Sequence, residues 1–453
     1  MSLPLQRAEA EHEVAVMPQQ AATLNALQKD SFSYFINQAN PANGLVLDKS
    51  RAEWPASIAA VGLALGVYPI GVECGFIARE QAIERSLNTL RFFDQAPQGK
   101  RSNASGYKGF YYHFLRMDTG RRAWKSELSS IDSALLFAGM LTAAAYFQHE
   151  TAPENEIRML ADKLYRRADW QWMQNGGAAV SHGWTPERGF LPYHWKGYDE
   201  ALIVYLLGLG SPTHALTPDS YAAWCSTHKW KRKYDIDYLY AGPLFIHQLS
   251  HVWVDFRGIR DRFMREHDLD YFENSRRATY VQQQYAIRNP LEFEHYDKHC
   301  WGITSSDGPG PTQMVINGIQ RVFYDYIARG APYGPDDGTM APWAVVASLP
   351  FAPEIVLPTI ENFERMHLNE PHQYGYKATF NPTYPLGTNE EYGWVSPYHF
   401  GLNQGPIVMM IENFRSGYVW QLMRQCPYLV TGLRRAGFNG AWLEDNIANK
   451  GAS

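Results

Sequence analysis

The chain has 453 residues, a formal net charge of −5 at pH 7 and 19% charged residues. Its Lys and Arg residues form no basic stripe, which argues against a nucleic-acid partner. No apolar run reaches the length of a membrane span, and the four cysteines lie far apart without a C-x-x-C pair, so the sequence predicts neither a membrane helix, a disulfide framework nor a zinc cage.

Aromatic side chains make up 14% of the chain and include 14 Trp and 28 Tyr. Tyr and Trp combine a flat apolar face with a polar group, which suits sugar rings with their apolar C–H faces and hydroxyl rims. A large aromatic core would have the same composition. The composition leaves both interpretations open.

The spacing of apolar residues and the positions of Gly and Pro predict mostly helices joined by long loops. Segment 109–122 alternates like a short hairpin. No linker divides the chain, so we expect an N-terminal extension with little order at 1–20 and a single domain at 21–445. The predicted helices are, in chain order, 21–38, 54–67 (ending near Pro69), 78–93, 126–147, 155–173, 201–210, 219–227, 243–253, 271–287, 311–328, 340–348, 353–366, 406–423 and 428–435.

About a dozen helices in alternating inner and outer layers predict an all-α fold. They can close as an (α/α)6 barrel, or toroid, with long aromatic-rich loops around a pocket at one end. A two-domain helical bundle would give the same pattern of helices. Long loops in a compact domain usually carry function, and the loop from 374 to 404 is the longest of them.

The segment 191–212 runs from a polar, aromatic loop into the apolar stretch ALIVYLLGLG, with Asp199 and Glu200 at the junction. Asp199 suits a helix N-cap, which would place Glu200 in the first turn below a wall of aromatic rings. Burial raises the pKa of a carboxyl there and helix-end N–H groups lower it. General-acid chemistry needs a carboxyl of this kind; the alternative is a capped helix with a solvated Glu.

Other acids stand at loop-to-helix junctions. Glu127 and Asp132 flank the start of an apolar helix, where first-turn capping is the alternative role. Asp307 lies in a Ser-Asp-Gly turn, and Asp336 and Asp337 lie in a Pro/Gly loop that could hold a cation, pair carboxylates or only make turns. Without a phosphate loop or a nucleophile elbow, carboxylates and aromatics remain, which are the residue types of glycoside hydrolysis.

Two histidines, His247 and His251, have the i, i+4 spacing of a zinc-binding helix, but Gln248 replaces the Glu of H-E-x-x-H. His299 and Cys300 add possible ligands without a useful spacing. Hydrogen-bonded histidines in a packed helix are therefore the better interpretation. We predict no metal and no cofactor.

Several long strings resemble the bacterial glycoamylase-like domain, whose characterised members form glycoside hydrolase family 144, the β-1,2-glucanases. The resemblance covers about residues 25–425. It implies an (α/α)6 barrel, hydrolysis of β-1,2-linked glucan without a metal, inversion at the anomeric carbon, and a periplasmic or secreted protein. The strings include GYDEALIVYLLGLGSPTH, YAGPLFIHQLSHVWVDFRGI, HCWGITSSDGP, RGAPYGPDDGTMAPWAVVASLPFAPE, FNPT and NQGPIVMMIENFRSGYVW.

The resemblance makes Glu200 the leading general acid, with Asp199 where the family usually has Asn. The base stays open among Asp132, Asp307, Asp337 and Glu391. A glucan is the expected partner, and we expect a monomer. The residues predicted to contact the substrate are Trp124, Glu127, His194, Tyr198, Trp253, Arg257, Trp301, Asn381, Trp394 and Gln404.

Competing functions are a hydrolase of another glucan linkage, as in a glucoamylase, a polysaccharide lyase on a similar helical barrel, a glucan-binding protein without catalysis, and a metal-dependent hydrolase. An unsaturated product would indicate a lyase, the absence of any product a binding protein, and inhibition by chelators a metalloenzyme. The sequence alone does not distinguish these alternative functions.

Overall fold

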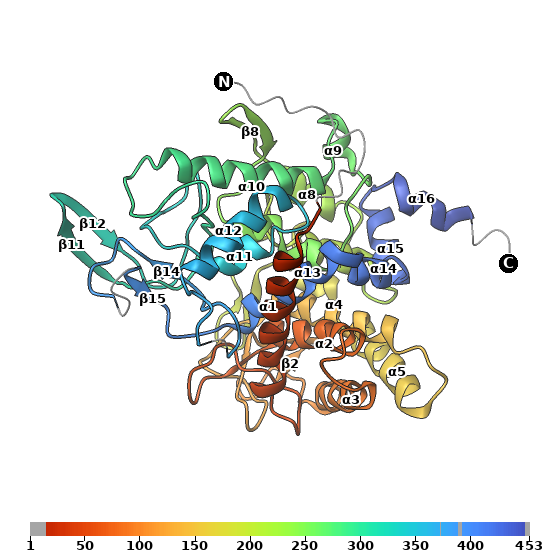
Figure 1. The fold of residues 1–453 in the computed structure, drawn as a ribbon. Helices are drawn as coiled ribbons and strands as arrows, with labels where there is room; N and C mark the ends of the chain where they lie inside the picture. Colours follow the sequence, from red (N-terminus) through yellow and green to blue (C-terminus); the bar gives the residue numbers. More distant parts are fainter. Residues whose placement is uncertain (1–14, 372, 388–391, 449–453) are drawn as a thin grey trace.

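A computed structural model describes residues 15–371, 373–387 and 392–448. Figure 1 shows a helix-rich body, with the long helices α1 and α10 on its outside. The helices are α1 Pro18–Asn37, α2 Ile58–Glu73, α3 Arg79–Gln95, α4 Ser130–Tyr146, α5 Ala152–Arg166, α6 Trp170–Met173, α7 Leu202–Gly210, α8 Ser220–Cys225, η1 Leu244–His247, η2 Leu249–Val252, α9 Arg262–Glu266, α10 Tyr271–Arg288, α11 Pro342–Val346, α12 Pro353–Arg365, α13 Gly401–Ser416, α14 Tyr418–Arg424, α15 Pro427–Arg435 and α16 Ala441–Ala448.

Short strands lie in the connections between these helices. They pair antiparallel in separate sheets, of two strands each except for β5-β6-β7. Their bounds are β1 Ala56–Ser57, β2 Gly106–Tyr107, β3 Phe110–Tyr111, β4 Phe114–Leu115, β5 Leu128–Ser129, β6 Gly183–Thr185, β7 Gly189–Phe190, β8 Trp230–Lys233, β9 Ile236–Leu239, β10 Ser305–Ser306, β11 Thr312–Ile316, β12 Ile319–Phe323, β13 Ile327–Ala328, β14 Phe380–Asn381 and β15 Trp394–Val395.

The helices differ in how they are buried. Helices α2, α4, α7, α11 and α13 are buried over most or all of their length, as their nearly continuous apolar sequences require. Helices α3, α5, α10 and α12 bury one face and expose the other. One hydrophobic core cluster includes residues from Leu24 to Leu443. The described chain therefore has inner and outer helices.

Each inner helix packs against other inner helices. Helix α2 packs on α4 and α13, α4 packs on α7, and α13 packs on α11 and η2. The N–H of Ile203 in α7 donates to Ser250 Oγ in η2 at 3.2 Å, and Gln248 Nε2 donates to the carbonyl of Ala344 in α11 at 2.6 Å. These contacts bring the N-terminal ends of α4 and α7 near the loop before α2.

Helices α2 and α4 approach one another at glycines. A Cβ atom on Gly139 would lie 1.9 Å from the carbonyl oxygen of Gly62, and one on Gly62 would lie 2.3 Å from the carbonyl of Leu135. No side chain fits in that space. The Gly residues of these apolar helices are therefore needed for the close packing of the inner layer.

Five sequence predictions of elements are wrong. The helices predicted at 155–173 and 406–423 are each two helices, α5 with α6 and α13 with α14. The helix expected to end near Pro69 continues to Glu73, since packing on all sides offsets the one hydrogen bond that Pro cannot donate. The helix predicted at 243–253 is two 3-10 turns. The helix predicted at 311–328 is the hairpin β11–β12 with its neighbour β13.

The 109–122 segment is only partly a hairpin. Strand β3 pairs with β2, and β4 pairs with β1 rather than with β3. A bridge between Leu115 and Arg122 supplies the one local pairing that the alternation predicted. The result is a network of short strands that joins the loop before α2 to the loop before α4.

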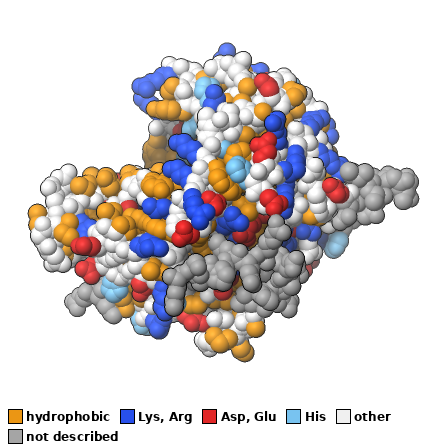
Figure 2. Space-filling model, turned by 90° about the horizontal axis from the view of Figure 1, so that it is seen from above, with side chains coloured by type: hydrophobic (Ala, Val, Ile, Leu, Met, Phe, Trp, Pro, Cys, Tyr) orange, Lys and Arg blue, Asp and Glu red, His pale blue; other side chains and the backbone are white. Residues whose placement is uncertain are grey.

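The hairpin β11–β12 projects from the body, at the left of Figure 1. Val315, Ile319 and Val322 are exposed on it, and Figure 2 shows apolar side chains over this lobe. Elsewhere on that face Lys and Arg side chains are interspersed with acidic ones. In the described chain, no helix combines the length and the apolar character that crossing a membrane requires.

Candidate active site

Carboxyl groups from distant parts of the sequence gather where α4 and α7 begin. Asp132 lies in the first turn of α4, and Glu200 lies in the turn before α7. The negative charges of both, and those of Asp48 and Asp307, raise the pKa of the Tyr326 hydroxyl, after burial as the first cause. The four acids therefore lie near enough to this phenol for their charges to act on it. We call these five residues, with His113 and Glu127, the acidic cluster.

The cluster is open to solvent. The side chains of His113, Glu127 and Asp132 are 30%, 31% and 11% exposed, and Tyr326 is 58% exposed. Burial nevertheless raises the pKa of the Tyr326 hydroxyl. Groups that lie among protein atoms and still reach solvent are accessible to a ligand, which fully buried carboxyls are not.

The surroundings of Glu200 favour the protonated form of its carboxyl. Burial, then the charges of Asp199 and Asp132, raise the pKa of Glu200 to about 8. Asp199 accepts hydrogen bonds from the N–H of Ala201 at 3.0 Å and from Trp224 Nε1 at 2.8 Å. Helix α7 begins at Leu202 with Ala201 as N-cap, so Asp199 is not the N-cap predicted from the sequence, and Glu200 precedes the first turn.

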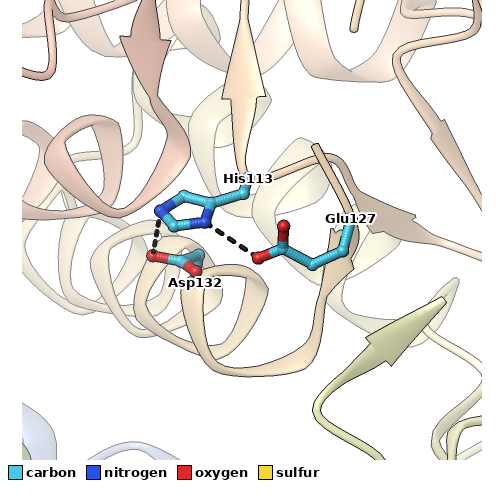
Figure 3. Close-up of side chains that lie close together, drawn as sticks. All are labelled: His113, Glu127 and Asp132. Atoms are coloured by element: carbon cyan, nitrogen blue, oxygen red, sulfur yellow. Dashed lines mark hydrogen bonds and ion pairs between the residues drawn. The ribbon is translucent and has the colours of Figure 1, made fainter. Parts of the chain in front are cut away.

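His113 lies between two carboxylates (Figure 3). Its Nδ1 is 2.9 Å from Glu127 Oε1 and its Nε2 is 3.6 Å from Asp132 Oδ1. The other oxygen of Asp132 accepts from Ser129 Oγ at 2.5 Å. Burial alone would lower the pKa of His113, but the charges of Asp132, Glu127 and Asp48 raise it to about 9.

The same three residues present ligand atoms within 4.8 Å of one another, a spacing that could hold a metal ion. A metal would need a lone pair on one imidazole nitrogen. Both nitrogens of His113 instead face carboxylate oxygens, which is the arrangement of a doubly protonated ring. The donor set fits an imidazolium ion pair better than a metal centre.

Asp48 and Lys49 form the side of the cluster before α2. Asp48 Oδ2 accepts from Trp54 Nε1 at 3.0 Å, and burial is the main cause that raises the pKa of Asp48. The Lys49 ammonium lies over the rings of Trp54, Tyr398 and Phe400, at 4.1–5.3 Å from the ring centres. Its positive charge acts on the carboxyls of both Asp48 and Asp307.

Asp307 is buried and hydrogen-bonded on both oxygens. Its Oδ1 accepts from Thr379 Oγ1 at 2.9 Å and its Oδ2 from Ser396 Oγ at 2.7 Å. Burial raises its pKa, and these hydroxyl donors lower it in part. The carboxyl belongs to the acidic cluster, and like Asp132 it has a partner on each oxygen.

Exposed rings border the cluster. Trp124 is 55% exposed, with φ at 52°, and packs on Trp54 and Phe114 with ring centres at 4.5 and 5.2 Å. Phe114 in turn stacks on the ring of His113 at 3.9 Å. Trp124 therefore offers a ring face to solvent next to the acidic cluster, and its role as a substrate contact stays a prediction.

Two other predicted contacts are also accessible. His194 is exposed, and its backbone forms an antiparallel β-bridge with Ser181. The charges of His194 and Glu127 both act on His182, so His194 lies on the same side of the molecule as the acidic cluster. Trp394 is partly exposed in strand β15, which pairs with β14. Glu391, a predicted base, lies outside the described residues.

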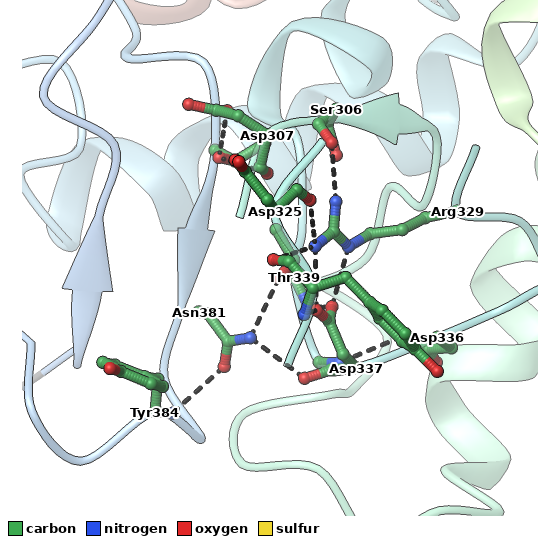
Figure 4. A network of polar contacts seen from close by, with 12 residues as sticks. Ser306, Asp307, Asp325, Arg329, Asp336, Asp337, Thr339, Asn381 and Tyr384 are labelled. Atoms are coloured by element: carbon green, nitrogen blue, oxygen red, sulfur yellow. Dashed lines mark hydrogen bonds and ion pairs between the residues drawn. The ribbon is translucent and has the colours of Figure 1, made fainter. Parts of the chain in front are cut away.

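Asp337 forms a buried ion pair with Arg329 and is not suited to act as a base. Arg329 Nε and Nη2 each donate to one of its oxygens at 2.8 Å, and both side chains are fully buried. The N–H groups of Tyr324 and Thr339 also donate to it. Figure 4 shows the guanidinium of Arg329 between Asp337 and the carbonyl of Ser306. No oxygen of Asp337 remains available to activate water.

Five predicted substrate contacts are buried, so the structure argues against that role. Tyr198 packs against other aromatic rings, and Trp301 Nε1 donates to Thr359 Oγ1 at 2.9 Å. The amide of Asn381 donates to the carbonyl of Asp337. A loop rich in aromatic and polar residues supplies core side chains as well as surface ones. The five are Tyr198, Trp253, Trp301, Asn381 and Gln404.

Arg257 lies elsewhere. Its guanidinium pairs with Asp255 at 2.8 Å and stacks over Trp420 at 4.7 Å. Arg257, Asp255 and Trp420 line a cavity of about 220 Å³ beside the C-terminal end of α13. A second cavity, of about 390 Å³, lies between the 290–293 loop and β12. Neither cavity is lined by a residue of the acidic cluster.

The pair His247 and His251 is hydrogen-bonded within the protein, as predicted. His247 Nε2 contacts the carbonyl of Ala241 at 3.3 Å, and His251 Nε2 contacts Ser275 Oγ at 3.0 Å. Burial lowers the pKa of His247 to about 4 and that of His251 to about 3. Both rings are neutral core histidines.

Sequence reasoning missed His113, Asp48, Lys49 and Tyr326. His113 stands in an alternating Tyr-Tyr-His-Phe run, where one ring among others gives no signal. Asp48 and Lys49 lie in a short polar loop, and Tyr326 lies in a segment predicted as helix. Only the pairing of β1 with β4 and the return of β13 bring them to the starts of α4 and α7.

Comparison with known proteins places residues 192–427 in the family named Glycoamylase, described as putative glucoamylase. A solved structure of a putative glucoamylase from Bacteroides uniformis is 30% identical, with a TM-score of 0.82 over 95% of this chain and 100% of that one. A β-1,2-glucanase structure from Parabacteroides distasonis is 25% identical, with a TM-score of 0.80 over 92% of this chain and 60% of that one.

A characterised relative from Parabacteroides distasonis is 27% identical over 448 residues, covering 91% of this chain. It is an exo β-1,2-glucooligosaccharide sophorohydrolase that acts at the non-reducing end. This chain spans 57% of the length of that relative.

Proposed function

Because the chain belongs to the Glycoamylase family, we propose that it is a glycoside hydrolase that cleaves β-1,2-linked glucan. The observation that carries the proposal is the acidic cluster, in which the charge of Asp132 acts on Glu200, whose pKa is near 8, and Asp132 itself faces the His113 cation. Glu200 keeps its proton at pH 7, while Asp132 has a cation opposite one oxygen, and acid–base hydrolysis needs two carboxyls in such different environments. The relatives that act on β-1,2-glucan support the choice of linkage.

Glu200 acts as the general acid. It is neutral at pH 7 and gives its proton to the glycosidic oxygen as the bond to the anomeric carbon breaks, either directly or through a substrate hydroxyl. Asp132 acts as the base and takes a proton from the water that attacks the anomeric carbon from the opposite face. The new C–O bond forms with inversion, and the two carboxyls exchange protons with solvent before the next turnover.

Among the described candidates, Asp132 is preferred over Asp307 and Asp337 as the base. Asp337 is sealed against Arg329, and both side chains are fully buried. Asp132 is 11% exposed and lies near enough to Glu200 for its charge to raise that residue's pKa. Asp132 also faces the His113 cation, so of these three carboxyls it is the one that both acts on Glu200 and lies against a positive charge.

We also infer that the inner elements α2, α4, α7, η2, α11 and α13 form the inner ring of an (α/α)6 barrel, with 21–445 as one domain. The chain of contacts from α2 through α4, α7, η2 and α11 to α13 and back supports this closure. An experimental structure in which α13 and α2 do not meet would contradict the ring.

Trp124, Glu127, His194 and Trp394 stay as the proposed substrate contacts, because each is at least partly accessible. A monomeric state and export from the cytoplasm stay predictions. Light scattering on the purified protein and fractionation of the producing cells would test them.

Product analysis tests the proposed function. The protein is incubated with linear β-1,2-glucan and, separately, with starch, and the products are identified by chromatography while NMR follows the anomeric form of the new reducing end. We expect β-1,2-linked products released first as the α-anomer, and no cleavage of starch. Cleavage of starch alone would support a glucoamylase, and an unsaturated product would indicate a lyase.

A further inference from the structure

His113 is held by its backbone as well as by its side chain. Its N–H donates to the carbonyl of Glu127 at 2.9 Å, and its carbonyl accepts from the N–H of Ile58 at 3.2 Å. The residue thus joins the start of α2 to the strand that leads into α4. The ring also stacks on Phe114, with 3.9 Å between ring centres. The imidazole is therefore fixed in one orientation.

The charged groups that face this ring are all negative. Glu127 lies opposite Nδ1 and Asp132 opposite Nε2, from the segment that enters α4. Asp48 adds a third negative charge from the loop before α2. A neutral imidazole has one N–H and could satisfy only one of these carboxylates, whereas the protonated ring donates to both.

We propose that His113 is a positioning residue that remains protonated and holds the Asp132 carboxylate ionised and oriented as the base. The inference rests on the proposed function, because it assigns a base to that reaction. The imidazolium itself does not touch the substrate in this account. Its effect passes through Asp132, whose second oxygen is fixed by Ser129 at the N-cap of α4.

The positive charge of His113 determines the direction in which the pKa of Asp132 changes. Burial raises the pKa of Asp132, and the charge of His113 opposes that rise in part, so that the pKa stays above its ordinary value. An opposite charge within about 4–6 Å lowers a carboxyl pKa by roughly 1–3 units. Without the cation, Asp132 would take up a proton at a higher pH and the water would lose its base.

The variants His113→Gln and His113→Asn test this. Both are neutral, and each amide can keep a donor near the position of one ring nitrogen, so the charge is removed while part of the hydrogen bonding remains. We expect the acid limb of kcat/KM on β-1,2-glucan to move upward by about 1–3 pH units in both variants. An acid limb at the wild-type position in a folded variant would overturn the proposal.

His149→Gln is the matched control. His149 also faces a carboxylate, with Nδ1 at 3.4 Å from Glu154 Oε1, but it lies outside the acidic cluster and is well exposed. We expect its acid limb and its rate to equal those of the wild type. A shift of the limb in this variant as large as in His113→Gln would contradict a specific role for His113.

NMR titration of the ring supplies a readout that needs no substrate. In ¹⁵N-histidine-labelled protein, the resonance lost in His113→Gln identifies His113, and we expect it to titrate near pH 9. Glu127→Gln should lower that midpoint. A midpoint at or below the ordinary 6.5 would overturn the proposal even if the pH limb moved. Wild-type protein that leaves β-1,2-glucan intact would contradict the proposed function, and the titration would still decide whether His113 is a cation.

Discussion

At the scale of single residues, the proposed mechanism requires two carboxyls with different pKa values, and their different environments provide that difference. Glu200 has the negative charges of Asp199 and Asp132 beside it, and after burial these raise its pKa to about 8. Asp132 has a cation in contact and a hydroxyl donor on its other oxygen. The same residue types without these neighbours would both be ionised at pH 7, and neither would serve as an acid.

Trp124 gives a residue-scale prediction about binding. Its exposed ring can cover a sugar face, and losing that apolar contact costs on the order of 1.5 kcal/mol. We expect Trp124→Ala to raise KM roughly tenfold, with little change in kcat. Steady-state kinetics on β-1,2-glucan oligosaccharides would measure both constants.

The control for Trp124→Ala is Tyr333→Ala. Tyr333 is similarly exposed but contacts Tyr240 and Lys231, outside the acidic cluster. Its removal should leave KM unchanged. Equal values of KM for Trp124→Ala and the wild type would exclude Trp124 from the binding surface.

Glu200, Asp132 and Asp307 were singled out from the sequence, and all three lie in the acidic cluster. The sequence could not separate Trp124, which is exposed, from Trp253 and Trp301, which are in the core. Only packing decides which ring meets solvent.

At the scale of elements, the inner helices set the geometry of the cluster. The carbonyl of Gly62 would lie 1.9 Å from a Cβ on Gly139, so α2 and α4 can approach only because both carry Gly there. This contact fixes the start of α4, and with it Asp132, relative to the loop that carries Asp48. Element packing therefore controls the distance between catalytic groups.

Gly139→Ala should destabilise the protein, because the backbone of α2 cannot move away without disturbing the inner layer. Overpacking of this kind costs about 1–3 kcal/mol, or more where backbone blocks the new atom. Urea unfolding would measure the loss in the free energy of unfolding. Gly99→Ala, where a Cβ meets open space, is the control. Equal stability of Gly139→Ala and the wild type would contradict the close approach of the helices.

The hairpin β11–β12 illustrates a signal that helical periodicity concealed. Residues 312–323 read TQMVINGIQRVF, and Asn-Gly between β-branched residues is a strong two-residue hairpin signal. In the structure Asn317 and Gly318 have φ of 50° and 80°, and Ile316 pairs with Ile319. The helices with continuous apolar sequences were predictable, since α2, α4 and α7 are buried on all sides. Pairings such as β1 with β4 were not, because two-residue strands carry no periodicity.

At the scale of the whole molecule, the cluster costs stability. The folded pKa of Glu200 is near 8 against an ordinary 4.5, so the folded state disfavours its ionised form. The stability that the neutral carboxyl contributes is complete below about pH 4.5 and is lost as the pH rises through 8. A site built from enclosed acids therefore weakens the fold in alkaline solution.

Glu200→Gln should remove that loss. We expect the variant to unfold at a higher temperature than the wild type at pH 9 and at the same temperature near pH 4, with the difference growing between. Thermal unfolding followed by circular dichroism at several pH values would measure it. A variant that is less stable than the wild type at pH 9 would show that Glu200 is ionised and favourably paired in the folded protein.

The most direct test of Glu200 as the general acid is the rate of Glu200→Gln on linear β-1,2-glucan. We expect kcat/KM of the wild type to fall above about pH 8, as Glu200 loses its proton, and that of the variant at pH 6 to be about 10²–10⁴-fold lower than the wild-type value. A folded variant that cleaves the glucan at the wild-type rate would contradict the account.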